Sequence, residues 1–297
     1  NYMLNVGPDG MGRVPEMSAR ILRRLGRWLG VHGEAIYGTS PSPLGPMPWG
    51  ECTARDGKLY LHVLHWPGDG RLIVPGLPAS VRSVRLMGSR AKLSVRKLDG
   101  GTEIRLPSRR PGSLVPVIEI YVRGRLTAPR DPVVLNNCVQ SLVAPAAAGK
   151  GFRQNKLSWM EKFGDWKHME CLSDWRAPRG RAAWSFATIE PGWLYVDVEY
   201  SSVPESDYSE WRMRLGDADV TFPLIASGHC RVGDSGGNRE LARFRTYRVG
   251  LFELPRGRQT LSLGPTRPPG GPVHISAMIL TPLRGGNGSK AAGTRRR

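Results

Sequence analysis

The clearest fold signal in the chain is the segment Trp193-Leu194-Tyr195-Val196-Asp197-Val198-Glu199-Tyr200, in which apolar residues alternate with other residues. A period of two places Leu194, Val196 and Val198 on one face of an extended strand. Similar short runs recur from residue 157 to residue 283, with Gly- and Pro-rich turns between them. This part of the sequence therefore predicts a β-sandwich or jelly roll.

A second series of short runs lies between residues 45 and 126. Several of its members alternate, and Gly or Pro stands between them. The runs are 58–64, 83–86, 92–95, 102–106 and 117–122. They predict an antiparallel sandwich of modest size, so we expect a mainly β chain with two sandwich modules.

Residues 1–40 have a different pattern, because the strand-like segment 2–6 is followed by a Gly-Pro-Asp-Gly turn and a helical period. Apolar residues recur there at spacings of three and four residues, and Pro15 suits the first turn of a helix. The stripe consists of Ile21, Leu22, Leu25, Trp28 and Leu29. One strand and one helix cannot bury such a stripe alone, so we expect the remnant of a larger α/β domain.

Two further segments lack a clear period. Residues 127–156 include the small-residue run 144–149, and we predict a linker carrying at most one strand. Residues 284–297 are rich in Gly, Ser and Arg, and we predict a disordered basic tail.

Composition narrows the classes of protein to consider. Apolar residues make up 40% of the chain, no run of eighteen apolar residues occurs, and we predict no membrane partner. The net charge is +18, but the positive residues are spread along the chain without a recognition motif, and we predict no nucleic-acid partner. A basic nucleic-acid binder would need a continuous positive face.

The metal-ligating residue types are widely spaced. The four cysteines form no CxxC pair and the six histidines show no ligand spacing, so we predict no metal site and no cofactor. We expect buried thiols, and the sequence leaves open a disulfide between Cys171 and Cys230.

Three blocks near the start resemble the end of the catalytic domain of the α-L-fucosidases, glycoside hydrolase family 29. They are Asn1-Tyr2-Met3-Leu4-Asn5-Val6-Gly7-Pro8-Asp9-Gly10, Gly12-Arg13-Val14-Pro15 and Gly33-Glu34-Ala35-Ile36-Tyr37-Gly38-Thr39. Pro48-Trp49-Gly50 and the run that begins at Lys58 also look like the start of that family's C-terminal sandwich. The resemblance covers roughly residues 1–125, and the later module is only weakly similar to carbohydrate-binding modules.

The resemblance implies that residues 1–40 hold the last βα unit of a TIM-type barrel. It also implies a retaining hydrolase of fucosylated glycans with an Asp nucleophile and a Glu acid/base, two carboxyls about 5 Å apart. The catalytic motifs have no counterpart here, so we expect both carboxylates upstream, a C-terminal fragment and no activity of the fragment alone. The start at Asn1 instead of Met fits this expectation. Family resemblance suggests a secreted, periplasmic or lysosomal setting.

Few residues are candidates for contacts with substrate. Asn5 would end a barrel strand near the active site, or else bond the following turn. Asp9 belongs to a Pro-Asp-Gly turn and Glu34 follows the helix, so neither is assigned a catalytic role. Most strand tryptophans should fill the core, whereas Trp166 and Trp175 lie outside the clearest strands beside charged residues and are our candidates for stacking on a sugar.

Two readings of the whole chain remain. In the first, the chain completes and braces the N-terminal barrel of the same protein, and its second sandwich binds glycan or packs against another subunit in a homo-oligomer. In the alternative, it is a non-catalytic carbohydrate-binding or structural β-sandwich protein.

Overall fold

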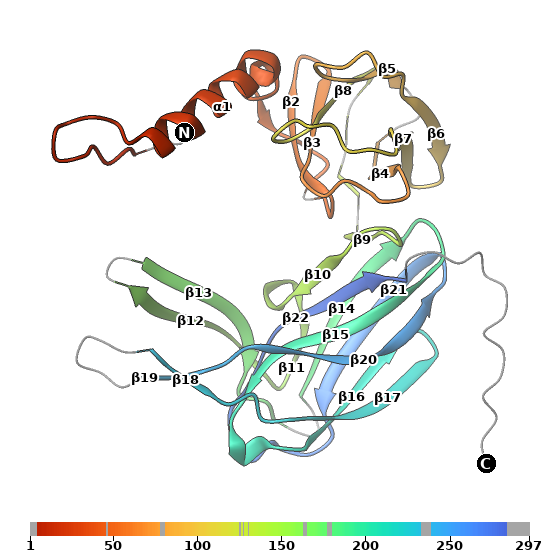
Figure 1. The fold of residues 1–297 in the computed structure, drawn as a ribbon. Helices are drawn as coiled ribbons and strands as arrows, with labels where there is room; N and C mark the ends of the chain where they lie inside the picture. Colours follow the sequence, from red (N-terminus) through yellow and green to blue (C-terminus); the bar gives the residue numbers. More distant parts are fainter. Residues whose placement is uncertain are drawn as a thin grey trace. The chain divides into compact units, whose positions relative to one another are not determined.

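The computed structural model describes residues 5–45, 47–77, 81–124, 126, 128–129, 131–162, 165–176, 180–232 and 239–283. At residues 159–162, 165–167, 229–232 and 239–242 it describes the backbone only. The chain divides into two compact units, Asn1–Arg130 and Asp131–Arg297 (Figure 1). None of the described helices is long and apolar enough to cross a bilayer.

The first unit begins with the predicted amphipathic helix. Helix α1 spans Glu16–His32 and continues into a 3₁₀ turn, η1, at Gly33–Ala35. Pro15 precedes the helix, where its missing N–H costs little, and the acidic Glu16 in the first turn suits the helix dipole. Of the strand predicted at 2–6, residues 2–4 lie outside the described residues, and residues 5 and 6 are not in a strand.

Two antiparallel sheets follow α1 in this unit. The strands are β1 (Ser40–Pro41), β2 (Gly50–Arg55), β3 (Lys58–Val63), β4 (Arg71–Pro75), β5 (Val81–Leu86), β6 (Ser94–Leu98), β7 (Gly101–Arg105) and β8 (Val117–Val122). One sheet has the order β1-β2-β3-β8-β5 and the other the order β4-β7-β6. All five predicted runs are strands, and β1, β2 and β4 are additional.

The central strand β3 is buried on both faces. Leu59 and Leu61 are fully buried on one face, and on the other face Tyr60 packs in a cluster with Ala35 of η1, against which Trp28 of α1 also packs. The indole Nε1 of Trp28 donates to the carbonyl of Val115 at 2.8 Å. The C-terminal end of α1 is therefore part of the core of this unit.

The second unit is a larger sandwich of two sheets. Its strands are β9 (Val133–Val134), β10 (Gln140–Val143), β11 (Ala148–Lys150), β12 (Arg153–Lys162), β13 (Asp165–Ser173), β14 (Arg181–Thr188), β15 (Gly192–Ser202), β16 (Ser209–Leu215), β17 (Ala218–Leu224), β18 (His229–Val232), β19 (Arg239–Ala242), β20 (Arg245–Leu254), β21 (Gly257–Pro265) and β22 (Val273–Pro282), with 3₁₀ turns η2 (Ala144–Ala146) and η3 (Pro204–Ser206). One sheet has the order β12-β13-β22-β15-β20 with β10 on β22, and the other β11-β14-β21-β16-β17 with β9 on β14. The hairpin β18-β19 pairs separately.

The inner faces of these sheets form one core. Leu194, Val196 and Val198 of β15, which the alternation placed on one face, belong to it together with Trp184 and Trp211. The mainly β architecture predicted from the sequence is confirmed.

The prediction of a linker at 127–156 is wrong for most of that segment. It contains β9, β10, β11 and the start of β12, all within the second unit. Ala144 and Ala147 are buried in the core, and the Trp184 Nε1 donates to the carbonyl of Val143 at 2.9 Å. Pairing with distant strands stabilises these short strands. Their own sequences therefore need not carry a periodic pattern. The predicted tail at 284–297 lies outside the described residues.

Candidate functional site

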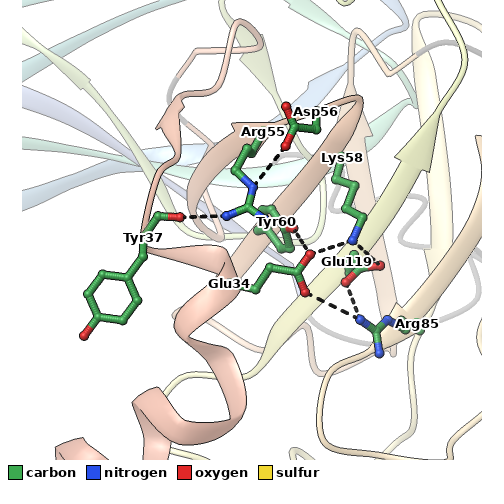
Figure 2. A network of polar contacts seen from close by, with 8 residues as sticks. All are labelled: Glu34, Tyr37, Arg55, Asp56, Lys58, Tyr60, Arg85 and Glu119. Atoms are coloured by element: carbon green, nitrogen blue, oxygen red, sulfur yellow. Dashed lines mark hydrogen bonds and ion pairs between the residues drawn. The ribbon is translucent and has the colours of Figure 1, made fainter.

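A cluster of charged and polar residues joins the end of α1 to the sheet of the first unit (Figure 2). Tyr60 on β3 and Arg85 on β5 both lie opposite Glu119 on β8, so the three form one row across the sheet. Lys58 is two residues before Tyr60 and shares its face. Glu34 reaches this face from η1. The cluster is thus assembled by β-pairing and by the position of η1.

Two carboxylates and two cations neutralise each other in this cluster. The Oε1 of Glu34 accepts from Lys58 Nζ at 2.6 Å and from the Tyr60 hydroxyl at 2.8 Å. Arg85 Nη2 lies 2.5 Å from Glu119 Oε2 and 4.0 Å from Glu34 Oε2. Lys58 Nζ also lies 3.8 Å from Glu119 Oε1. Each charge therefore has a partner of opposite sign.

The protonation states follow from these contacts. The hydrogen bond from Lys58, and then that from Tyr60, lowers the pKa of Glu34. Burial, followed by the bond to Glu34, raises the pKa of Tyr60, which keeps its hydroxyl as a donor. A general acid of a retaining glycosidase needs a raised carboxyl pKa. The electrostatics of Glu34 therefore suit an anchor and not an acid catalyst.

The neighbouring segment, residues 35–37, is fastened by two more bonds to β2. The Thr53 hydroxyl donates to the carbonyl of Ala35 at 2.7 Å, and Arg55 Nη1 donates to the carbonyl of Tyr37 at 3.1 Å. These bonds satisfy backbone carbonyls after the helix end, where no intrahelical donor remains. Together with the Glu34 cluster they fix the end of α1 on the sandwich.

A second buried carboxylate, Glu103 on β7, lies between two arginines. Its Oε2 accepts from Arg71 Nε at 3.0 Å and from Arg96 Nη2 at 2.7 Å. Burial alone would raise the pKa of Glu103, but the bonds from Arg96 and Arg71 outweigh burial and lower it. Glu103 is therefore an ionised carboxylate held by two arginines, and its role is structural.

The residues that the sequence analysis singled out do not lie together in one site. Asn5 is exposed and outside this cluster. Asp9 stays within its turn, where its Oδ1 accepts from the backbone N–H groups of Met11 and Arg13, each at 2.9 Å. The bond from the Arg13 backbone, and then that from Met11, lowers the pKa of Asp9. Asp9 is thus explained by the turn.

The two tryptophan candidates have different outcomes. The side chain of Trp166 lies outside the described residues. Trp175 is only 8% exposed, and its ring packs edge-on against Trp211 with centroids 5.0 Å apart. Its Nε1 donates to the carbonyl of Leu172 at 3.3 Å. Trp175 is therefore placed in the core, with no open ring face for a sugar.

One tryptophan that was not singled out is exposed. Trp193 on β15 is 48% exposed, whereas Trp184 and Trp211 are buried. The alternation of β15 already contained this signal, because burial of Leu194 and Val196 turns Trp193 outward. Glu119 carried no such signal, because its place between Ile118 and Ile120 only puts it on the other face of the strand and does not reveal its partners on β3 and β5.

The described residues contain no group of three His, Cys, Asp or Glu arranged to hold a metal ion. Cys52, Cys138 and Cys171 are buried thiols, as predicted. Of the two cysteines for which the sequence left a disulfide open, Cys171 is a free thiol, and the side chain of Cys230 lies outside the described residues.

Known proteins resemble this chain in part. No family model matches it. An α-L-fucosidase of Dictyostelium discoideum is 32% identical over 136 residues, which are 44% of this chain and 27% of that protein. The tissue α-L-fucosidase of Homo sapiens is 31% identical over 122 residues, 38% of this chain and 26% of that protein. The chain thus spans about a quarter of the length of these relatives.

Similarity to a solved structure extends further along the chain. The crystal structure of an α-L-fucosidase from Vibrio sp. strain EJY3 superposes with a TM-score of 0.56 over 94% of this chain and 47% of that chain. The sequence identity is 21%, so this comparison concerns the fold.

Proposed function

This chain is related to the C-terminal region of the family 29 α-L-fucosidases, and on that relationship we propose that it belongs to a retaining glycosidase that releases terminal α-L-fucose from glycans. The observation that carries the proposal is the similarity of about 30% to several curated α-L-fucosidases. In this proposal the catalytic carboxylates lie in a barrel encoded elsewhere in the protein.

The surface of α1 supports the proposal of a covering domain. Met17 is 63% exposed and Ile21 is 59% exposed, although both belong to the apolar side of the helix that also carries Trp28. An exposed apolar stripe beside a well-packed helix end is typical of an interaction surface. We infer that the barrel covers this stripe.

The Glu34 cluster then has a mechanical role. It holds the end of α1 against the first sandwich through Lys58, Tyr60 and the 35–37 segment. If α1 is the last helix of the barrel, the sandwich braces the barrel through this contact. The cluster is proposed as a positioning device and not as catalytic machinery.

Glu34, Glu103 and Asp9 do not suggest an acid/base catalyst. The pKa values of Glu34, Glu103 and Asp9 are all lowered by hydrogen bonds that favour the ionised form. An acid/base residue needs the opposite shift. The fragment alone is therefore proposed to be inactive.

The test is hydrolysis of 4-nitrophenyl α-L-fucoside by the full-length protein and, separately, by this chain. Activity in the full-length protein alone is the expected result. Activity of the isolated chain would require a catalytic pair among its own residues and would contradict the proposal. Inactivity of both would favour a non-catalytic carbohydrate-binding or structural protein.

A further inference from the structure

The outward face of one sheet in the second unit carries a compact block of side chains. β15 runs between β22 and β20, and residues opposite each other on these strands share a face. The resulting outer block has three rows: Leu283, Trp193 and Glu253; Thr281, Tyr195 and Leu251; Ile279, Asp197 and Arg248.

The block faces away from the core. Leu194 and Val196, which alternate with its β15 members, are buried in the sandwich. Trp193 is 48% exposed, Leu251 is 39% exposed and Leu283 is 46% exposed. The N–H of Leu283 donates to the carbonyl of Trp193 at 2.9 Å, so these two residues lie side by side. An apolar platform is thus open to solvent around the Trp193 ring.

An ordered ion pair borders this platform. Arg248 binds Asp197 in a two-bond fork, with Nε–Oδ1 at 2.8 Å and Nη2–Oδ2 at 3.2 Å. The guanidinium carbon lies 4.3 Å from the centroid of the Tyr195 ring. A fork that also stacks on a ring restricts the arginine side chain, and a guanidinium has N–H donors beyond the two it uses here. Donors and acceptors are therefore held next to the half-buried ring of Tyr195, which lies between this pair and the exposed Trp193.

The block has the dimensions of a short sugar chain. Neighbouring strands are ~5 Å apart and residues i and i+2 are ~7 Å apart, which gives a surface of about 10 by 14 Å. A pyranose presents C–H groups on its faces and hydroxyls at its rim. Such a molecule suits an aromatic face flanked by polar groups.

The charges of the block favour a neutral ligand. Two carboxylates, Asp197 and Glu253, outnumber the one guanidinium, Arg248, so the block is net negative by one although the chain carries +18. An anionic ligand would be repelled by this surplus. A second copy of the chain, paired by two-fold symmetry, would have to bury the charges of both blocks, which costs free energy.

We propose that the outer block is a binding surface for a neutral oligosaccharide of two to three pyranose rings. One ring stacks on Trp193, and the Asp197–Arg248 pair, two rows further along β15, bonds hydroxyls of the third ring. This surface goes beyond the hydrolysis of fucosides, because it binds the glycan without cleaving it.

The experiment is a calorimetric titration of the whole chain with lactose, 2′-fucosyllactose, cellotriose and mannotriose. At least one of these probes should bind. Trp193→Ala should weaken that binding about 10-fold or more, since the loss of a stacked ring costs ~1.5 kcal/mol. Tyr208→Ala is the matched control, because Tyr208 is a 71% exposed aromatic residue of the same unit outside the block. This variant should bind like the wild type.

Several results would overturn the proposal. One is that none of the four probes binds. Another is that Trp193→Ala, with an unchanged unfolding midpoint, binds as tightly as the wild type. A third is that Trp193→Ala and Tyr208→Ala lose the same amount of affinity. Sedimentation that shows a wild-type dimer and a Trp193→Ala monomer would assign the block to a second copy instead. Retention only by a sulfated polysaccharide, lost in high salt, would show charge binding. None of these readouts depends on fucosidase activity.

Discussion

The carboxylate of Glu34 lies 2.6 Å from the ammonium of Lys58, although 24 residues separate them in the sequence. Glu34 belongs to η1 after the helix, and Lys58 is the first residue of β3. The pair therefore joins the helical segment to the sandwich. Both side chains are about one-third exposed, so solvent weakens the pair but does not remove it.

Replacing Glu34 by Gln should lower the stability of the first unit. The substitution keeps an acceptor for Tyr60 but removes the charge that pairs with Lys58. We expect a loss of about 1 kcal/mol in the free energy of unfolding, measured with urea. Glu51→Gln, at an exposed position on β2, is the control and should change little. Equal effects of the two variants would contradict the anchoring role.

The stability of the first unit should decrease in acid. Glu34 and Glu103 have folded-state pKa values below the ordinary glutamate value of 4.5. The unfolded chain therefore binds protons first, and the stabilisation is fully present above pH 4.5 and is lost as the pH falls through the folded values. Urea unfolding between pH 3 and pH 7 should show this decline, with a shallower slope in a Glu34→Gln, Glu103→Gln variant. An unchanged slope in that variant would exclude these two groups as the cause.

Truncation of two tryptophans of the second unit should change its stability by very different amounts. Trp211 is fully buried and packs against Trp175, whereas Trp193 is 48% exposed. Trp211→Ala should cost about 3–5 kcal/mol or prevent folding, and Trp193→Ala should cost less than about 1 kcal/mol. Thermal unfolding followed by circular dichroism compares the two. A large loss in Trp193→Ala would mean that its ring supports the fold.

The buried thiols should be slow to react in the folded chain. Burial raises the pKa of Cys52 to about 12 and that of Cys171 to about 11, and Cys138 is buried as well. Because the thiolate is the reactive form, Ellman's reagent at pH 8 should modify none of them quickly in a Cys230→Ser variant. Guanidinium should then release three thiols. A fast thiol before unfolding would contradict this burial.

The exposed stripe of α1 should matter only in the full-length protein. Ile21→Asp is expected to leave the unfolding of this chain within about 0.5 kcal/mol of wild type, since Ile21 is 59% exposed. In the full-length protein the same change should reduce fucosidase activity and thermal stability, because a charge would be buried against the barrel. Arg20→Asp, at an exposed helix position, is the control. Equal tolerance of both variants in the full-length protein would argue against a covered stripe.

Local patterns were enough to find long strands such as β15 and β22, but not β12 and β13, which are of similar length. β15 and β22 carry sustained alternation or apolar runs, and turn residues separate the strands. Two other strands that escaped prediction, β4 and β10, are short or non-alternating. They exist because distant strands pair with them, as β10 does with β22, and a local window does not contain that partner.

The sequence by itself determined that the chain is mainly β, that an amphipathic helix precedes the sandwiches, and that the first blocks resemble those of α-L-fucosidases. Only the tertiary structure decided which aromatic rings are open, because burial depends on the opposing sheet: it placed Trp175 against Trp211 and left Trp193 outside. It also brought Glu34 to Lys58 and Arg248 to Asp197, since β-pairing and chain reversal unite charges that lie 24 and 51 residues apart.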